Sequence, residues 1–437
     1  MKFFFKYIIV SILTWEAKGV LRKHKPFIVA VTGSVGKTST KDAIFDVLKA
    51  TIPTRKSEKS FNSELGVPLT ILGLENKWSS FFGWLINLVQ GFLMRMLPTP
   101  YPKQLILEIG ADHPGDIKRV ASWLTPDIVV VTRLPDMPVH VEFFSSPEEV
   151  KKEKAELVRA LKKTGVFIAN ADDPSVVALS SLTPAYMLTY GFGETAMVRG
   201  SAPEVDYEIK DNRKVPCGMK FIIDHHGEKH DVRIKGILGV HIVSAALAAC
   251  AVGVARGVPL VKIVASLEIL ESPRGRMRII SGKSGSTIID DSYNSSPVAL
   301  EAALATLRQV EANHRIALLG DMLELGKYSD TEHWNIGRNL GEWVDQFVSV
   351  GKRARGIAEG AKTAGLVEGK IRSFVDAKEA GAWLMPELKT GDIVLVKGSQ
   401  GSGENMIRME RAIKELMSHP EDADKLLVRQ ERQWQSQ

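Results

Sequence analysis

The sequence predicts an α/β fold that is built on a mostly parallel sheet. Along most of the 437 residues, short apolar segments alternate with segments in which apolar residues recur at helical spacing. This alternation is typical of parallel strands that are connected by helices. Several apolar segments end in a polar residue, and ligands of open α/β sheets bind beyond the carboxyl ends of the strands. The segments are 27–31, 105–107, 128–131 and 166–169, which lead to Thr32, Glu108, Thr132 and Asn170.

The first of these segments leads into a glycine-rich turn at residues 32–40, and a helical pattern follows. Strand, glycine-rich turn and helix in this order predict a phosphate-binding loop. Gly33 and Gly36 let backbone amides turn towards phosphate oxygens, and Lys37 can reach the terminal phosphates. The Thr38 hydroxyl can bind Mg²⁺. The predicted nucleotide contacts of the loop are Gly33, Ser34, Gly36, Lys37, Thr38 and Ser39.

Residue 32 departs from the strict phosphate-loop pattern, which has glycine where this chain has Thr32. The alternative interpretation is an ordinary glycine-rich turn between a strand and a helix. The Gly-Lys-Thr sequence at the start of the helix favours a variant phosphate loop.

The composition is that of a globular enzyme with two or three domains, since 44% of the residues are apolar and 25% are charged. The net charge of +6 comes from basic residues spread along the chain, and no nucleic-acid-binding motif stands out. This balance is compatible with anionic substrates or a membrane surface, and we expect no nucleic-acid partner. Cys217 and Cys250 are the only cysteines, which excludes a four-cysteine zinc site and fits a reducing cytoplasm.

Two apolar stretches near the N-terminus are too short or too polar to span a membrane. Residues 3–13 are interrupted by Lys6, and residues 78–97 contain Asn87, Gln90 and Arg95. The second stretch predicts a helix for which two interpretations exist. The helix packs within the protein or against a partner, or it lies at a membrane surface. The sequence leaves both interpretations open.

The second half of the chain predicts a further α/β domain. Alternating residues from about 200 to 235 indicate antiparallel strands, and an alanine-rich helix is expected at 243–256. After a break at 272–276, apolar strands recur at 287–289, 316–319, 347–350 and 393–396, which predicts a Rossmann-like α/β domain. The predicted organisation is therefore an N-terminal lead at 1–26, a central nucleotide-binding domain at 27–272 and a C-terminal domain at 273–437.

Lys154 lies in an unexpected position of a predicted helix. The helix should begin at Pro147, with Ser145 or Ser146 as its cap, and end at Gly165. At helical spacing, Lys154 falls in the middle of an apolar stripe. The stripe consists of Val150, Leu157, Val158 and Leu161. Either Lys154 extends out to solvent, or it points inward, where a buried amine could react with CO₂ to give a carbamate that binds Mg²⁺.

The order and spacing of these motifs resemble the Mur ligases, which are ATP-dependent amide-bond-forming enzymes of cell-wall peptide synthesis. Within that family the chain is most similar to the MurF type, which adds D-alanyl-D-alanine. The matching segments are 32–38, 62–68, Glu108, His140, Lys154, 170–174, Arg276, 290–294, 319–326 and 397–399.

The resemblance implies a role for each matching residue. The catalytic residues would be Lys37, Glu108, His140 and Lys154, with Lys154 carbamylated. Two Mg²⁺ ions would be bound by Thr38, Glu108, His140 and Lys154. The further nucleotide contacts would be His241, Arg276, Asp291, Tyr293 and Asn294, and the substrate contacts Asn62, Ser63, Lys397 and Ser399.

The implied reaction uses ATP to turn a peptide carboxylate into an acyl phosphate, which an amine then attacks. The implied partners are a muramyl peptide and D-alanyl-D-alanine, and the implied enzyme is a cytoplasmic monomer. The apolar stretches leave open a peripheral position at the inner face of the membrane, or a protein partner. The alternatives are a ligase for another acidic peptide or polymer, and an ATP-binding scaffold without activity.

Some positions depart from the family pattern. Asparagine is usual at the positions of Asp112, Ile242 and Ser296, and arginine is usual at the position of Gln400. MurF-type ligases also carry an N-terminal domain that holds the uridine nucleotide of the substrate, whereas only 26 residues precede the first predicted strand here.

Overall fold

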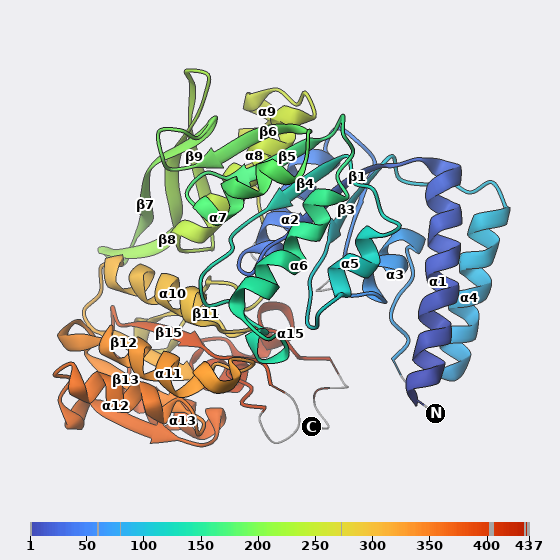
Figure 1. The fold of residues 1–437 in the computed structure, drawn as a ribbon. Coiled ribbons are helices and arrows are strands. Elements are labelled where there is room, and N and C mark those ends of the chain that lie inside the picture. The colour runs from blue at the N-terminus through green and yellow to red at the C-terminus, as the bar shows by residue number, and fades with distance from the viewer. Residues whose placement is uncertain are drawn as a thin grey trace.

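The computed structural model describes residues 2–58, 61–78, 80–271, 273–401, 406–431 and 434, with the side chains of all of these except residues 2–5 and 342. It confirms the predicted α/β class, and the strands form two sheets (Figure 1). The nine-stranded sheet A lies in the first part of the chain, and the six-stranded sheet B lies in the second part.

Sheet A is parallel over most of its width. Its strands, in spatial order, are β2 (Thr54–Lys56), β3 (Gln104–Glu108), β1 (Phe27–Thr32), β4 (Ile128–Val131), β5 (Val166–Asn170), β6 (Tyr186–Gly191), β7 (Val198–Lys210), β8 (Arg213–His225) and β9 (Glu228–Lys235). Pairing is parallel from β2 to β7 and antiparallel from β7 to β9, as the sequence predicts for residues 200–235. The carboxyl ends of β1, β3, β4 and β5 therefore meet at one edge of the sheet.

Helices cover both faces of sheet A and bury two separate hydrophobic cores. On one face lie α2 (Lys37–Lys49), α8 (Val240–Ala255) and α9 (Leu260–Glu268). On the other lie α1 (Lys2–His24), α3 (Gly66–Leu72), α5 (Asp116–Ala121) and α6 (Pro147–Arg159). The short helix α7 (Pro174–Val177) follows β5. The side chains of residues 29, 31 and 130 face the first core, and those of residues 28, 30 and 129 face the second, as the alternation of side chains along a strand requires.

Sheet B is parallel except at one edge. Its strands, in spatial order, are β10 (Arg278–Ser281), β11 (Thr287–Asp291), β15 (Ile393–Lys397), β12 (Arg315–Gly320), β13 (Gln346–Val350) and β14 (Ile371–Phe374). Only the β10–β11 pair is antiparallel. The helices of this part are α10 (Pro297–Gln309), α11 (Ser329–Arg338), α12 (Arg355–Thr363), α13 (Ala377–Leu384), α14 (Glu410–Leu416) and α15 (Ala423–Leu426). The first core of sheet A continues into this part through buried side chains such as Met277 and Leu300.

The predicted end of helix α6 is wrong. Ser146 caps the helix as predicted, since its hydroxyl accepts a hydrogen bond from the Glu149 amide, but the helix ends at Arg159 rather than at Gly165. Gly165 instead closes a turn that enters β5. A side chain there would lie 2.6 Å from the carbonyl oxygen of Asp127, so the glycine is needed for close approach of two backbone segments.

The first apolar stretch is the start of a longer helix. α1 runs from Lys2 to His24, and α4 (Phe81–Met96) packs against it at the edge of the molecule (Figure 1). The two helices run in the same direction, because Glu16 lies against Gly91 and Lys23 donates to the Met94 carbonyl. One face of α4 is thus packed within the protein, which confirms that part of the prediction. Among the described residues, no helix is both long and apolar enough to cross a membrane.

Candidate active site

The glycine-rich loop follows β1 and is shaped by its neighbour β4. At Gly33 the backbone φ is 141°, and a Cβ there would lie 2.0 Å from Thr132 Oγ1. Thr132 also donates to the Val35 carbonyl at 2.6 Å, and the Ser34 amide donates to the Arg133 carbonyl at 2.8 Å. The loop is therefore fixed from the end of β4, which places the N-terminus of α2 at the carboxyl edge of the sheet.

Lys37 is the first residue of α2, and its side chain folds back over the loop. Its Nζ donates to the Gly33 carbonyl at 2.9 Å. Burial lowers the pKa of Lys37, while the Glu108 carboxylate opposes this effect. An anion at the loop would therefore stabilise the charged form of this lysine.

Glu108, at the end of β3, contacts side chains from two other segments. Its Oε1 accepts from Thr38 Oγ1 at 3.2 Å and from Asn62 Nδ2 at 3.5 Å. Lys41 Nζ lies 3.8 Å from Glu108 Oε2, which is buried and accepts no hydrogen bond from the described residues. A buried carboxylate oxygen with unused acceptor capacity, next to a threonine hydroxyl, is suited to a hard cation.

His140 connects the two parts of the chain. Its Nδ1 lies 2.8 Å from Glu324 Oε2, and its Nε2 lies 3.6 Å from Asp112 Oδ1. Glu324 follows β12 and therefore comes from the sheet B part. The contact with His140 is the main reason that the pKa of Glu324 is lowered.

Lys154 is buried, so the prediction that it points inward rather than to solvent is confirmed. Only 1% of the residue is exposed, and no hydrogen bond or ion pair reaches its Nζ from the described residues. Burial, followed by repulsion from Lys37, lowers the pKa of Lys154 to about 7. A substantial fraction of this amine is therefore uncharged at neutral pH.

The sheet B part brings a second group of polar residues to the same place. Lys397, at the end of β15, donates to Asp291 Oδ2 at 2.6 Å and to the Asn294 carbonyl at 2.9 Å. Arg276 lies over the ring of Tyr293, with 4.2 Å between the guanidinium carbon and the ring centroid. The side chains that follow β11 and β15 thus form one wall.

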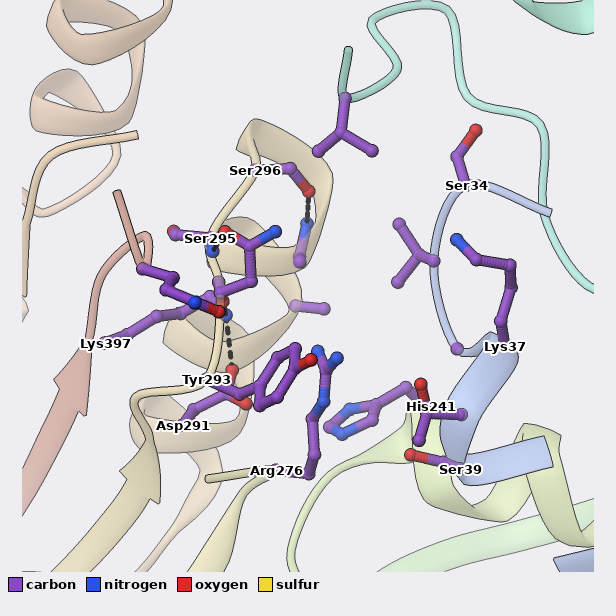
Figure 2. A pocket seen from close by; sticks show the side chains of 18 of the residues that line it. Ser34, Lys37, Ser39, His241, Arg276, Asp291, Tyr293, Ser295, Ser296 and Lys397 are labelled. Carbon is purple, nitrogen blue, oxygen red and sulfur yellow. Dashed lines mark hydrogen bonds and ion pairs between the residues drawn. The ribbon is translucent and has the colours of Figure 1, made fainter. Parts of the chain in front are cut away.

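These groups enclose a cavity of about 370 Å³. Figure 2 shows Ser34, Lys37 and Ser39 on one side of it, Lys397, Ser295 and Ser296 on the other, and His241 and Arg276 between them. The predicted site residues that line it are Ser34, Gly36, Lys37, Thr38, Ser39, Asn62, Glu108, His140, His241, Arg276, Asp291, Tyr293, Asn294 and Lys397.

Four predicted site residues do not line this cavity. Gly33 is the loop residue that packs against Thr132, and Lys154 is buried within electrostatic range of Lys37. Ser63 lines a neighbouring cavity of about 840 Å³ that shares Thr38 with the first. Ser399 lies beneath the site, where its hydroxyl donates to the Ser295 carbonyl at 3.1 Å and accepts from the Leu323 amide at 3.0 Å.

The comparisons with known proteins decide the family. The family model for the Mur ligase middle domain matches residues 90–253, and the model for the Mur ligase glutamate ligase domain matches residues 275–400. The chain belongs to the Mur ligase family. This Mur ligase is therefore an ATP-dependent ligase of the kind that builds peptidoglycan precursors, and such ligases need Mg²⁺.

Relatives and solved structures of the MurF type resemble this Mur ligase over most of its length. It is 33% identical to the UDP-N-acetylmuramoyl-tripeptide–D-alanyl-D-alanine ligase of Mycobacterium tuberculosis strain H37Rv over 396 residues, which is 86% of this chain and 71% of the relative. The enzyme of that name from Bacillus subtilis is 28% identical over 406 residues, which is 92% of this chain and 79% of the relative.

Among solved structures, MurF from Acinetobacter baumannii matches with a TM-score of 0.75 at 25% identity, covering 93% of this chain and 79% of the other. MurF from Thermotoga maritima in complex with ADP has the same fold, with a TM-score of 0.74 at 23% identity. The match covers 95% of this chain and 84% of the other.

Sequence reasoning missed several groups around the site of this Mur ligase. It assigned no role to Glu324, which contacts His140, or to Lys41, which lies near Glu108. Lys41 could have been found, because residues four apart on a helix share a face with Lys37. Asp112 was noted only as a departure from the family pattern. No sequence signal pairs Glu324 with His140, which are 184 residues apart.

The residues present fit a metal site that lacks one ligand. Among the described residues, no group of three His, Cys, Asp or Glu side chains could hold a metal ion. Glu108 and His140 are two suitable donors, and the buried, partly uncharged Lys154 is the residue that could supply a third after carbamylation. The donor set is hard and oxygen-rich, as Mg²⁺ requires.

Proposed function

We propose that this Mur ligase joins D-alanyl-D-alanine to a muramyl tripeptide at the expense of ATP. The observation that carries the proposal is the cavity in which the glycine-rich loop meets residues of sheet B, on a chain whose relatives bear the name of this ligase. The adjoining cavity, which shares Thr38, Arg276 and Tyr293 with the first, provides room for a second substrate beside the nucleotide.

In this proposal the acceptor carboxylate attacks the γ-phosphorus of ATP, ADP leaves, and the amine then displaces phosphate from the acyl phosphate. Both steps concentrate negative charge, so positioning and charge stabilisation account for most of the catalysis. Lys37 and the amide of Gly36 would face the phosphates. Bound phosphate would replace the Gly33 carbonyl as the partner of Lys37.

Two Mg²⁺ ions are part of the proposal. Thr38 would hold one, and Glu108, His140 and carbamylated Lys154 would hold the other. The carbamate forms when the uncharged Nζ of Lys154 bonds to the carbon of CO₂ and releases a proton. When bound, Mg²⁺ supplies positive charge to the phosphates and to the acceptor carboxylate.

The remaining assignments follow the geometry of the cavity. His241, Arg276, Asp291, Tyr293 and Asn294 would contact the nucleotide. Asn62, Ser63 and Lys397 would contact the other substrates, and Ser399 would act by holding the Ser295 carbonyl. We also assign the central domain to residues 27–272 and the C-terminal domain to 273–437, with the enzyme acting as a monomer in the cytoplasm.

The test is ATP turnover by the purified chain. Phosphate release should depend on both UDP-N-acetylmuramoyl-tripeptide and D-alanyl-D-alanine, and mass spectrometry should find the pentapeptide product. Lys37→Ala should abolish turnover, since losing such an electrostatic group costs about 3 kcal/mol or more. Lys49→Ala, at the far end of the same helix and paired with Asp46, is the matched control and should keep full activity.

Two results would contradict this assignment. Release that depends on a different acidic peptide would indicate a ligase with another substrate. No release with any acceptor, despite ATP binding, would indicate a scaffold without activity.

A further inference from the structure

The outer face of α4 is a continuous apolar surface. Phe82 is 74% exposed, Ile86 54% and Val89 52%, and Leu85, Phe92 and Leu93 are also about half exposed. These residues lie three or four apart, so they occupy one side of the helix. The opposite side, with Trp84, Asn87 and Gly91, packs against α1. Figure 1 shows α4 at the outer edge of the molecule, where no other labelled element covers it.

The segments around this face contain many basic residues and almost no acidic ones. Residues 76–107 contain no Asp or Glu, and residues 1–26 contain only Glu16. The same two segments hold nine Lys and Arg. Glu16 is buried between α1 and α4, and this burial raises its pKa to about 7, so even this carboxyl is largely uncharged below neutral pH.

A basic cavity lies on the neighbouring side of α1. It has a volume of about 460 Å³ and is lined by Lys18, Arg22, Lys25 and Lys162, together with Trp123. Among the described residues, only Lys162 of these four has a carboxylate partner, Asp127. Lys18 lies 5.9 Å from the centroid of the Trp123 ring. The cavity therefore offers three cations without partner carboxylates to an anionic group.

We propose that the α1–α4 face docks on the surface of an anionic lipid bilayer. In this arrangement α4 lies in the plane of the interface, its apolar side chains enter the boundary between headgroups and acyl chains, and the cations of α1 meet lipid phosphates. A second copy of the chain fits this face less well, since its own basic residues would then meet one another. The inference concerns binding alone, so it stands or falls separately from the proposed ligase activity.

The test is co-sedimentation of the full chain with vesicles. The chain should pellet with phosphatidylglycerol vesicles at low salt and bind phosphatidylcholine vesicles roughly tenfold or more weakly, because each Lys or Arg near an anionic surface contributes to binding. High salt should weaken the binding without abolishing it, since the apolar contribution is not screened.

Paired variants separate the two contributions. Phe82→Asp with Ile86→Asp should abolish pelleting, and Arg22→Glu with Lys25→Glu should remove the preference for phosphatidylglycerol. The matched controls are Ile269→Asp, at an apolar residue that is 73% exposed elsewhere, and Lys378→Glu on α13, and both should bind like the unchanged chain. Circular dichroism and ATP turnover without vesicles should be the same for all variants.

Three results would overturn the proposal. They are an absence of pelleting at low salt, equal pelleting of the Phe82→Asp, Ile86→Asp variant, and light scattering that shows a dimer which this variant dissociates while vesicles are not bound.

Discussion

Lys154 has the environment of a reactive amine rather than that of a surface lysine. The structure buries it without a partner among the described residues and lowers its pKa to about 7. Helical spacing placed it in the apolar stripe, because Val150 and Leu157 on either side of it face the core, but spacing left open whether the side chain extends to solvent or points inward. Its closeness to Lys37 could not be predicted, because that depends on how α6 and α2 are placed around sheet A.

The first prediction concerns this amine. Lys154→Ala should lower kcat by roughly a hundredfold or more, because a carbamate ligand contributes transition-state charge stabilisation of about 3 kcal/mol. Short carboxylic acids added to the assay should restore part of the activity by occupying the vacated ligand position. Lys151→Ala, at an ion-paired lysine of the same helix, is the control. Unchanged turnover by Lys154→Ala would mean that the lysine has only a packing role.

The second prediction concerns Glu324, which positions His140. Glu324→Ala should raise the Mg²⁺ concentration needed for half-maximal activity by about 10- to 100-fold, as is typical when the partner of a ligating histidine is lost. Glu324→Gln keeps an oxygen that accepts a hydrogen bond and should recover most of the affinity. A Mg²⁺ titration of phosphate release measures the effect, and equal curves for all three proteins would refute the positioning role.

At the scale of elements, the strands were easier to predict than the helices. Buried parallel strands are apolar over most of their length, so their positions are evident from the sequence. The end of α6 was misplaced because Gly165 serves the close approach to Asp127 rather than a helix cap. The length of α1 was missed because its second half carries the charged residues Glu16, Lys18 and Arg22. These interrupt the apolar pattern, although Leu13, Ala17 and Val20 face the core.

The third prediction belongs to the packing of α1 on α4. The pKa of Glu16 is raised from 4.5 to about 7, so the folded state holds this proton more tightly than the unfolded state. The stability that this provides is complete below pH 4.5 and is lost as the pH rises through about 7. Relative to the unchanged chain, Glu16→Gln should therefore gain about 2 kcal/mol between pH 5 and pH 8.

Urea unfolding at the two pH values measures this gain. Glu75→Gln, at an exposed glutamate, should show no pH-dependent difference. A Glu16→Gln difference that is the same at both pH values would show that Glu16 does not titrate in this range.

At the scale of the whole molecule, the end of the chain supports the site. Arg429, which follows α15, is buried and donates to the carbonyls of Ser292 and Tyr293 at 3.2 and 2.5 Å. It also donates to Glu410 at 2.8 Å. The loop after β11, which lines the cavity, is thus held from behind by a residue near the end of the chain.

The fourth prediction separates two effects of Arg429. Arg429→Met should destabilise the protein by about 3 kcal/mol, because Glu410 loses a buried partner, and should raise KM for ATP several-fold. Arg429→Lys keeps a positive charge beside Glu410 and should restore much of the stability but not the KM, because a single ammonium group does not replace the guanidinium at both carbonyls. Thermal unfolding and ATP titration give the two readouts, and a KM that recovers together with stability would show that Arg429 acts on stability alone.

The site as a whole could be predicted only in part. Residues 32–40 were identifiable because a phosphate loop is continuous in sequence. The cavity wall formed by Asp291 and Lys397 depends on β11 and β15 being neighbours in sheet B, although 101 residues separate these strands. Periodicity predicts each strand but not their order, so only the resemblance to the Mur ligases connected these residues before the structure did.

The contact between His140 and Glu324 has a consequence for the timing of the reaction. His140 belongs to the sheet A part of the chain and Glu324 to the sheet B part. The pair therefore exists only while the two parts are closed on each other. A nucleotide bound to an open form would meet a histidine whose ring is not oriented. ATP would then be cleaved only after closure has also excluded water from the cavity. The contact that completes the site would therefore also suppress unproductive hydrolysis of ATP.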